Sequence, residues 1–181
     1  IIHGSTRPGR GGLPVSHWIE KTAREHGAFN VELVDLGEVR LPLLDEPEHP
    51  AKQAYTHEHT KAWSRRIAPG DAFVFVTPEY DFFPSAALVN AIQCLSREWQ
   101  NKPAGIVSYG GISGGLRAAE TLKRLTNAVG LVTLGATVPV PMYAQFIENG
   151  ALKPNEPRAA GAKALLDQLA KFTQTLAPLR A

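Results

Sequence analysis

Short apolar runs alternate with stretches of helical apolar spacing along the whole chain. The clearest run is Phe73–Val76, whose consecutive apolar residues are typical of a strand buried on both faces. After a break at Thr77 and Pro78, the spacing becomes that of one helix face, with apolar residues at Ala87, Leu88, Ala91, Ile92 and Leu95. Pro84 suits the first turn of this helix, because a missing N–H costs nothing there.

The same alternation predicts the other elements. Strands are expected at residues 1–3, 31–36, 72–77, 104–108 and within 131–139, the last interrupted by Gly135. Helices are expected at about 13–26, 51–68, 84–98, 116–129 and 162–176. This repeated strand–helix order predicts an α/β fold, a five-stranded parallel sheet of order 2-1-3-4-5 between two layers of helices. No repeat or linker interrupts the pattern, so residues 1–181 are expected to form one domain.

Composition narrows the class of protein. A net charge of +2 gives no electrostatic reason to expect nucleic acid or an anionic membrane as a partner. No apolar stretch approaches the roughly 20 residues needed to cross a bilayer. The single cysteine, Cys94, excludes an internal disulfide framework and fits a reducing compartment, so we expect a cytoplasmic protein.

The loop after the first strand, residues 4–12, has the composition of an anion site. The hydroxyls of Ser5 and Thr6, the side chain of Arg7 and the N-terminus of the following helix could together hold a phosphate. An ordinary strand–helix turn with solvated arginines is the alternative. The spacing of Gly4 and Gly9 nearly spells a P-loop, but the lysine and the hydroxyl of that motif are missing, and no G-x-G-x-x-G occurs. The loop therefore suits a monophosphate.

Two further unusual loops follow the third and fourth strands. Residues 78–83 provide a rigid backbone and an aromatic wall, and residues 108–115 contain four glycines in eight positions, which permits close backbone approach. In the alternative interpretations, Phe82 and Phe83 pack under the sheet edge or in a dimer contact, and the glycine-rich loop is merely flexible. In the predicted strand order, all three loops open at one end of the sheet. Together they predict a mononucleotide site.

Three motifs resemble those of the NADPH-dependent FMN reductase family, which has a flavodoxin-like fold and includes quinone, chromate and azo-dye reductases. Residues 4–10, GSTRPGR, resemble its phosphate loop G-S-x-R-x-G. Residues 77–80, TPEY, with Pro84 and the NAI of residues 90–92, resemble T-P-E-Y-N…P…L-K-N-A-I. Residues 108–111, SYGG, and the following glycines resemble its third loop. The chain departs from the pattern at Asp81, where the family usually has Asn, and at Val89, where Lys is usual.

The resemblance implies an FMN-dependent oxidoreductase. It would take hydride from NADPH or NADH and pass two electrons, by a ping-pong mechanism, to a small-molecule acceptor such as a quinone or free flavin. The implied FMN site consists of Ser5, Thr6, Arg7, Arg10, Gly11, Gly12, Pro78, Glu79, Tyr80, Asp81, Ser108, Tyr109, Gly110 and Gly111. Because the flavin carries the chemistry, no catalytic side chain is required, although Tyr80 or Tyr109 could donate a proton to a quinone. A flavin-binding electron carrier or redox sensor, or a fold relative that binds another ligand, are the alternatives.

Two other features bear on metals and assembly. The sequence His57-Glu58-His59 is not HExxH, and adjacent helical side chains do not face one metal, so we expect a solvated helix face and no metal site.

Phe82, Phe83 and Trp99 flank the helix after the third strand and would leave a monomer with an exposed apolar patch. This predicts a homodimer built on the helices at about 84–98 and 116–128, with a tetramer left open.

Overall fold

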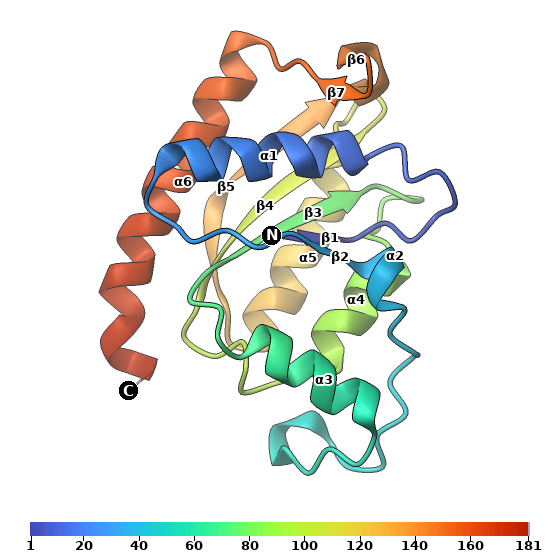
Figure 1. Ribbon diagram of the computed structural model, residues 1–181, viewed down its shortest axis with the longest axis vertical. Helices are drawn as coiled ribbons and strands as arrows, with labels where there is room; N and C mark the ends of the chain where they lie inside the picture. The colour runs from blue at the N-terminus through green and yellow to red at the C-terminus, as the bar shows by residue number, and fades with distance from the viewer. Residues whose placement is uncertain (181) are drawn as a thin grey trace.

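The computed structural model describes residues 1–180 and contains a parallel five-stranded sheet (Figure 1). Its strand order is β2-β1-β3-β4-β5, as predicted. The strands are β1 (Ile2–His3), β2 (Val34–Asp35), β3 (Phe73–Pro78), β4 (Pro103–Gly110) and β5 (Val132–Pro141). The order reverses between β1 and β3, so the loops after these two strands lie on either side of a crevice.

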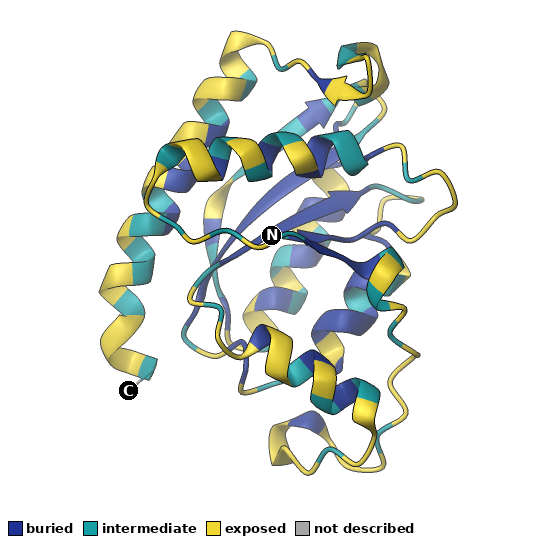
Figure 2. Ribbon diagram, viewed as in Figure 1, coloured by how far each residue is buried: buried dark blue, intermediate teal, exposed yellow. Residues whose placement is uncertain are grey.

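Helices cover both faces of the sheet, which makes the three-layer sandwich of a flavodoxin-like fold (Figures 1 and 2). One layer contains α1 (Leu13–His26) and α6 (Glu156–Leu176). The other contains α3 (Glu58–Ile67), α4 (Ala86–Gln93) and α5 (Leu116–Ala128). The side chains of β3 alternate between the layers: Phe73 and Phe75 pack with α3, α4 and α5, while Val74 and Val76 pack with α1 and α6.

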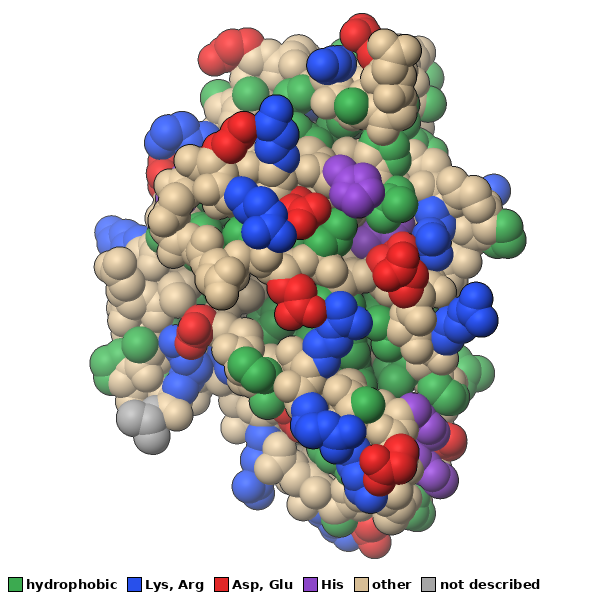
Figure 3. All heavy atoms as spheres, in the orientation of Figure 1, with side chains coloured by type: hydrophobic (Ala, Val, Ile, Leu, Met, Phe, Trp, Pro, Cys, Tyr) green, Lys and Arg blue, Asp and Glu red, His purple; other side chains and the backbone are tan. Residues whose placement is uncertain are grey.

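Short elements complete the chain. They are α2 (Leu36–Val39), the antiparallel pair β6 (Ile147–Glu148) and β7 (Ala151–Leu152), and the 3₁₀ helices Pro50–Lys52, Tyr143–Phe146 and Ala177–Arg180. Acidic and basic side chains are interspersed over α1 and α3 (Figure 3). Among residues 1–180, no helix is long and apolar enough to cross a membrane.

Two predicted elements in the first half of the chain are too long. The strand predicted over 31–36 is only Val34–Asp35, because the Asp35 carboxylate accepts the N–H of Gly37 at 2.8 Å and so caps α2. The helix predicted over 51–68 begins at Glu58. Pro50–Lys52 forms a separate 3₁₀ helix, and the residues just before α3 are irregular because the Glu46 carboxylate accepts the backbone N–H groups of Thr56 and His57.

The helix predicted over 84–98 is also shorter, and it places two residues differently. Ser85 is the N-cap, and its Oγ accepts the N–H of Leu88 at 3.3 Å, so Pro84 precedes the cap instead of occupying the first turn. After Gln93 the chain folds back, and Trp99 is 0% exposed, with its indole N–H donating to the Ile92 carbonyl at 3.0 Å. The prediction that Trp99 belongs to an exposed patch is therefore wrong.

His3 on β1 provides a pH-sensitive element of the fold. Its ring is buried, with Nδ1 2.7 Å from the Ser16 hydroxyl, and burial lowers its pKa to about 4, against an opposing effect of Asp35. The unfolded chain therefore binds a proton near pH 6.5 that the folded chain binds only near pH 4. We expect the free energy of unfolding to fall as the pH drops through this window.

Chemical denaturation between pH 7 and pH 4 measures this effect. The variant His3→Phe keeps a ring beside Tyr109 but has no proton to bind, so its stability should depend less steeply on pH. Equal slopes for His3→Phe and wild type would contradict the assignment.

Candidate functional site

A cavity of about 520 Å³ lies where the carboxyl ends of the strands meet. It brings together the three predicted loops, with lining residues Ser5, Arg7, Pro8, Arg10, Gly11, Gly12, Pro78, Glu79, Tyr80, Tyr109, Gly110 and Gly111. A fourth segment, residues 142–145 after β5, completes the wall. Sequence reasoning missed this segment, although β5 is parallel to the other strands and must end at the same edge.

The loop after β1 presents unpaired backbone donors. Gly12 is the N-cap of α1 and supplies no side-chain cap, and among residues 1–180 the N–H groups of Gly11 and Gly12 donate to no hydrogen bond. Ser5 is buried, and its Oγ lies 2.8 Å from the Tyr80 hydroxyl, which ties this loop to the one after β3. Free N–H groups at the positive end of a helix dipole favour an anion.

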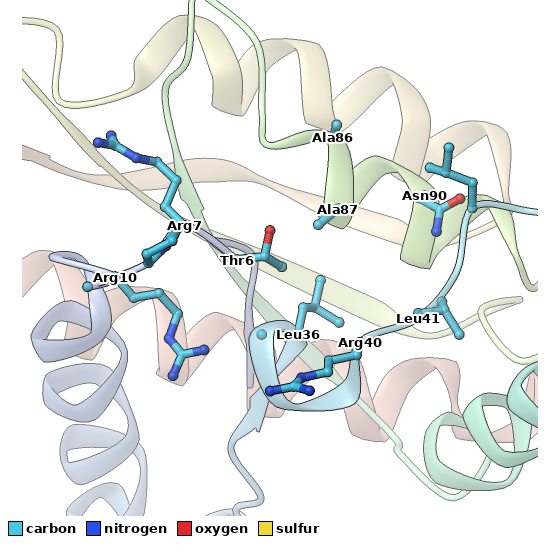
Figure 4. Close-up of a pocket in the computed structure, with 13 residues that line it drawn as sticks. Thr6, Arg7, Arg10, Leu36, Arg40, Leu41, Ala86, Ala87 and Asn90 are labelled. Atoms are coloured by element: carbon cyan, nitrogen blue, oxygen red, sulfur yellow. The ribbon is translucent and has the colours of Figure 1, made fainter.

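The two arginines of this loop differ in their partners. Arg10 forms an ion pair with Asp35, with 3.3 Å between Nη2 and Oδ2. Arg7 pairs with no carboxylate among the described residues, and its guanidinium lies 5.7 Å from the centroid of the Tyr80 ring. The two side chains leave the loop in different directions (Figure 4). Arg7 is thus the cation available to a ligand in this cavity.

Tyr109 forms the floor beneath the loop. It is 4% exposed and lies parallel to the His3 ring, with 6.4 Å between the centroids, while Tyr143 meets its edge. A Cβ atom on Gly12 would lie 2.0 Å from the Tyr109 ring, so only glycine permits this approach. Burial raises the pKa of Tyr109, which makes its hydroxyl proton harder to release. Proton donation by Tyr80 or Tyr109 stays a prediction.

Glu79 turns its carboxylate toward the start of α5. It accepts hydrogen bonds from the Ser113 hydroxyl at 2.8 Å and from the N–H groups of Arg117 and Ala118 at 3.0 and 3.2 Å. Partial burial alone would raise its pKa, but these bonds together hold the pKa below its usual value. The side chain therefore joins the loop after β3 to the loop after β4.

Glu79→Ala should lower the free energy of unfolding by about 1–2 kcal/mol, since it removes the cap of α5. Because the folded pKa is depressed, this contribution is present above the ordinary pKa and is lost as the pH falls through the folded value. Urea denaturation at neutral pH measures the change. Glu120→Ala on the exposed face of the same helix is the control and should be nearly neutral, and a neutral Glu79→Ala would contradict the capping role.

Three predicted site residues lie outside this cavity. Thr6 lines a neighbouring cavity, and Ser108 is fully buried, with no partner for its hydroxyl among the described residues. Asp81 is exposed at the tip of a two-residue turn, where Tyr80 and Phe83 exchange both backbone hydrogen bonds at 2.9 Å. Asp81 and Phe82 have φ values of 49° and 72°, the positive values that such hairpin turns require.

This turn also determines the positions of the two phenylalanines. Phe82 and Phe83 are 59% and 61% exposed, so the interpretation that they pack under the sheet edge is wrong. The Arg117 guanidinium lies 4.4 Å from the centroid of the Phe82 ring. The turn therefore projects aromatic surface beside the cavity and the first turn of α5.

His59 and Cys94 contribute nothing to the cavity. His59 bonds the Asp45 carboxylate at 2.9 Å, and its ring stacks on His57. Cys94 is buried, and burial raises the pKa of its thiol to about 11, which leaves it protonated at neutral pH. Residues 1–180 bring together no group of three His, Cys, Asp or Glu side chains that could hold a metal.

Comparison with known proteins identifies the family. The sequence model of the NADPH-dependent FMN reductase family matches residues 1–145. The chain belongs to this family. An NAD(P)H-dependent FMN reductase of Schizosaccharomyces pombe is 34% identical over 182 residues, which cover 99% of this chain and 84% of the relative. An NADPH:quinone oxidoreductase of Arabidopsis thaliana is 40% identical over 110 residues, 59% of this chain and 54% of that protein.

The fold of this family member also matches solved flavoenzymes. The flavoenzyme NAD(P)H:(acceptor) oxidoreductase FerB of Paracoccus denitrificans superposes with a TM-score of 0.75 at 21% identity, covering 96% of this chain and 95% of that one. At this identity the likeness concerns the fold.

FMN fits the residues of the cavity. Its volume of about 520 Å³ lies within the roughly 300–1,000 Å³ of typical cofactor pockets. The free N–H groups of the helix N-terminus and Arg7 suit a phosphate, while Gly110 and Gly111 leave the backbone open beside the aromatic side chains. The cavity therefore suits both the phosphate and the ring of a mononucleotide.

Proposed function

We propose that this chain is an FMN-dependent NAD(P)H oxidoreductase that passes two electrons to a quinone, free flavin or similar small acceptor. One observation carries the proposal: a single cavity joins an uncapped helix N-terminus and Arg7 to a glycine-lined wall with Tyr80 and Tyr143. Membership of the FMN reductase family supports it. The names of the relatives support both a flavin and a quinone as acceptor.

The residues of the chain bind and orient the cofactor. The Ser5 hydroxyl, the N–H groups of Gly11 and Gly12, and Arg7 would hold the phosphate at the N-terminus of α1. Pro78–Tyr80 and the backbone of Gly110–Gly111 would border the ring, and their N–H groups could stabilise negative charge on it. When bound, FMN supplies the transfer of electrons between NAD(P)H and the acceptor. The Tyr80 hydroxyl, 2.8 Å from Ser5 Oγ, could hold a proton at the rim.

Steady-state kinetics test the reaction and its order. Rates of NADPH oxidation, measured at several fixed quinone concentrations, should give parallel double-reciprocal lines, because donor and acceptor would use the same site in turn. Intersecting lines would contradict the ping-pong order. A protein that binds FMN but oxidises NADPH no faster with a quinone present would instead be an electron carrier or redox sensor.

We also propose that the protein is cytoplasmic and that it binds neither nucleic acid nor a membrane. The near balance of 19 basic and 17 acidic residues supports a protein that binds neither nucleic acid nor a membrane. The buried, reduced thiol of Cys94 is compatible with a cytoplasmic location.

We also propose a two-fold homodimer, with a tetramer as the larger alternative. Phe82, Phe83, Ile112 and Leu116 are large hydrophobic residues that are exposed around the start of α5. Exposed apolar side chains gathered beside a site are typical of an interface. Phe83→Asp should therefore shift the protein to a monomer in sedimentation experiments at micromolar concentration and lower its activity. Leu179→Asp, at the far end of the chain, is the control, and a wild-type protein that sediments as an active monomer would contradict the dimer.

A further inference from the structure

A second cavity, of about 610 Å³, also borders the loop after β1, and Figure 4 shows the residues that line it. Its walls come from this loop, from α2 with the residues that follow it, and from the start of α4. Arg7, Pro8 and Arg10 line both cavities, so the two are neighbours across a few residues of one loop. The FMN site described above makes no use of the second cavity.

The second cavity has excess positive charge. Arg10 reaches Asp35 by passing over α2, where a Cβ atom on Gly37 would lie 2.0 Å from Arg10 Nη1. Arg40 is the C-cap directly after the same short helix, is exposed, and pairs with no carboxylate within residues 1–180. Figure 4 shows the guanidinium groups of Arg10 and Arg40 at the α2 end of the cavity. In the described part of the chain, the lining of the cavity includes Arg7, Arg10 and Arg40 and no acidic residue, and the charge of Arg40 is left for a ligand.

Both arginines have a left-handed backbone, with φ 25° at Arg10 and φ 51° at Arg40, in the region that favours glycine. Arg40 is the C-cap of α2, and its N–H donates to the Leu36 carbonyl at 3.1 Å. Here a glycine at either position would relieve the strain, yet each position carries a long cationic side chain that lines the same cavity.

The remaining walls are suited to a flat, partly apolar group. Leu36, Leu41 and Ala87 contribute apolar surface. Asn90 holds the wall in place, because its Nδ2 donates to the Pro42 carbonyl at 2.7 Å and its Oδ1 accepts the N–H of Leu44 at 2.9 Å. An apolar wall beside a cluster of arginines is complementary to a nucleoside that carries a phosphate monoester.

We propose that this second cavity binds the adenosine 2′-phosphate half of NADPH, with Arg40 as the residue that recognises the 2′-phosphate. This inference rests on the proposed function, in which a nicotinamide dinucleotide donates electrons in the first cavity. The shared loop at Arg7 and Arg10 lies between the cavities, so the pyrophosphate of the dinucleotide would cross it. NADH lacks the 2′-phosphate, and Arg40 therefore makes the enzyme prefer NADPH.

Calorimetric titration of the FMN-loaded protein with 2′,5′-ADP and with 5′-AMP, which differ only in the 2′-phosphate, tests this assignment. Wild-type protein should bind 2′,5′-ADP about tenfold or more tightly than 5′-AMP, as expected for a charge-assisted bond to phosphate. Arg40→Gln should bind the two compounds equally and should retain wild-type affinity for FMN. Arg124→Gln, on the exposed surface of α5 and outside both cavities, should keep the preference. In turnover, Arg40→Gln should raise the KM for NADPH and leave the KM for NADH unchanged.

Three results would overturn the inference. They are equal binding of the two compounds by wild-type protein, a preference that survives Arg40→Gln, or a loss of FMN affinity in Arg40→Gln as large as the loss of 2′,5′-ADP affinity. Failure of the proposed function is a separate result. If the protein binds no FMN, the same titration of the flavin-free protein still shows whether Arg40 selects the 2′-phosphate.

Discussion

Gly12→Ala is expected to weaken FMN binding on the order of 10–100-fold while the sheet remains folded. The new Cβ would lie 2.0–2.3 Å from Cζ, Oη and Cε2 of Tyr109. The ring cannot easily move aside, because it is buried and stacked on His3. The N-terminus of α1 must shift instead, which displaces the free N–H groups from the phosphate position. Fluorescence titration of the flavin-free protein with FMN measures the loss.

A double variant separates this steric effect from other consequences of the substitution. Gly12→Ala combined with Tyr109→Leu removes the three tyrosine atoms that the Cβ would meet, and it should bind FMN more tightly than Gly12→Ala alone. Gly161→Ala on α6 is a matched control, because a Cβ there has no atom within 4 Å. If Gly12→Ala binds FMN like the wild type, the N-terminus of α1 is not the phosphate site.

Arg7→Ala is expected to weaken FMN binding by about 1.5–3 kcal/mol, roughly 10–150-fold, because it removes a charge-assisted bond to the phosphate. The fold should tolerate the change, since Arg7 pairs with no carboxylate among residues 1–180 and its guanidinium contacts the ring of Tyr80 only loosely, at 5.7 Å from the centroid. FMN titration gives the first effect, and thermal unfolding of the flavin-free protein gives the second. A large fall in melting temperature would show that Arg7 is structural.

Two further variants test whether the effect is specific to the guanidinium of Arg7. They are Arg7→Lys and the control Arg97→Ala. Lysine keeps the charge but loses the planar pair of donors, so Arg7→Lys should bind FMN with an affinity between wild type and Arg7→Ala. Arg97 is exposed and lines neither cavity, and its removal should leave FMN affinity unchanged. Unchanged affinity in Arg7→Ala would remove this residue from the site.

The sequence was sufficient to predict the arrangement of the sheet. Apolar runs without alternation identify doubly buried strands, and Phe73–Val76 does pack into both helical layers. The right-handed connections of parallel strands then leave few topologies, and the predicted order 2-1-3-4-5 is confirmed. Because strand order determines which loops meet, the convergence of the loops after β1, β3 and β4 could also be predicted.

Element boundaries and side-chain directions depend on contacts between distant residues. The helix predicted to start near residue 51 starts at Glu58, because the carboxylate of Glu46, in the preceding loop, binds the backbone before it. Glu79 was predicted to border the flavin and lines the cavity, but the use of its carboxylate to cap α5 was not predicted. Periodicity contains no signal for either interaction. The positive φ values of the two arginines in the second cavity could not be predicted either, because φ cannot be read from residue type.

Titration of the flavin-free protein with FMN, followed by anaerobic addition of NADPH, tests most directly whether the first cavity holds a working flavin. We predict that each chain binds one FMN, that NADPH bleaches the flavin absorbance, and that a quinone then restores it. Gly12→Ala and Arg7→Ala should need more FMN to reach the same end point. Absence of FMN binding, or a bound FMN that NADPH does not reduce, would contradict the assignment of this cavity.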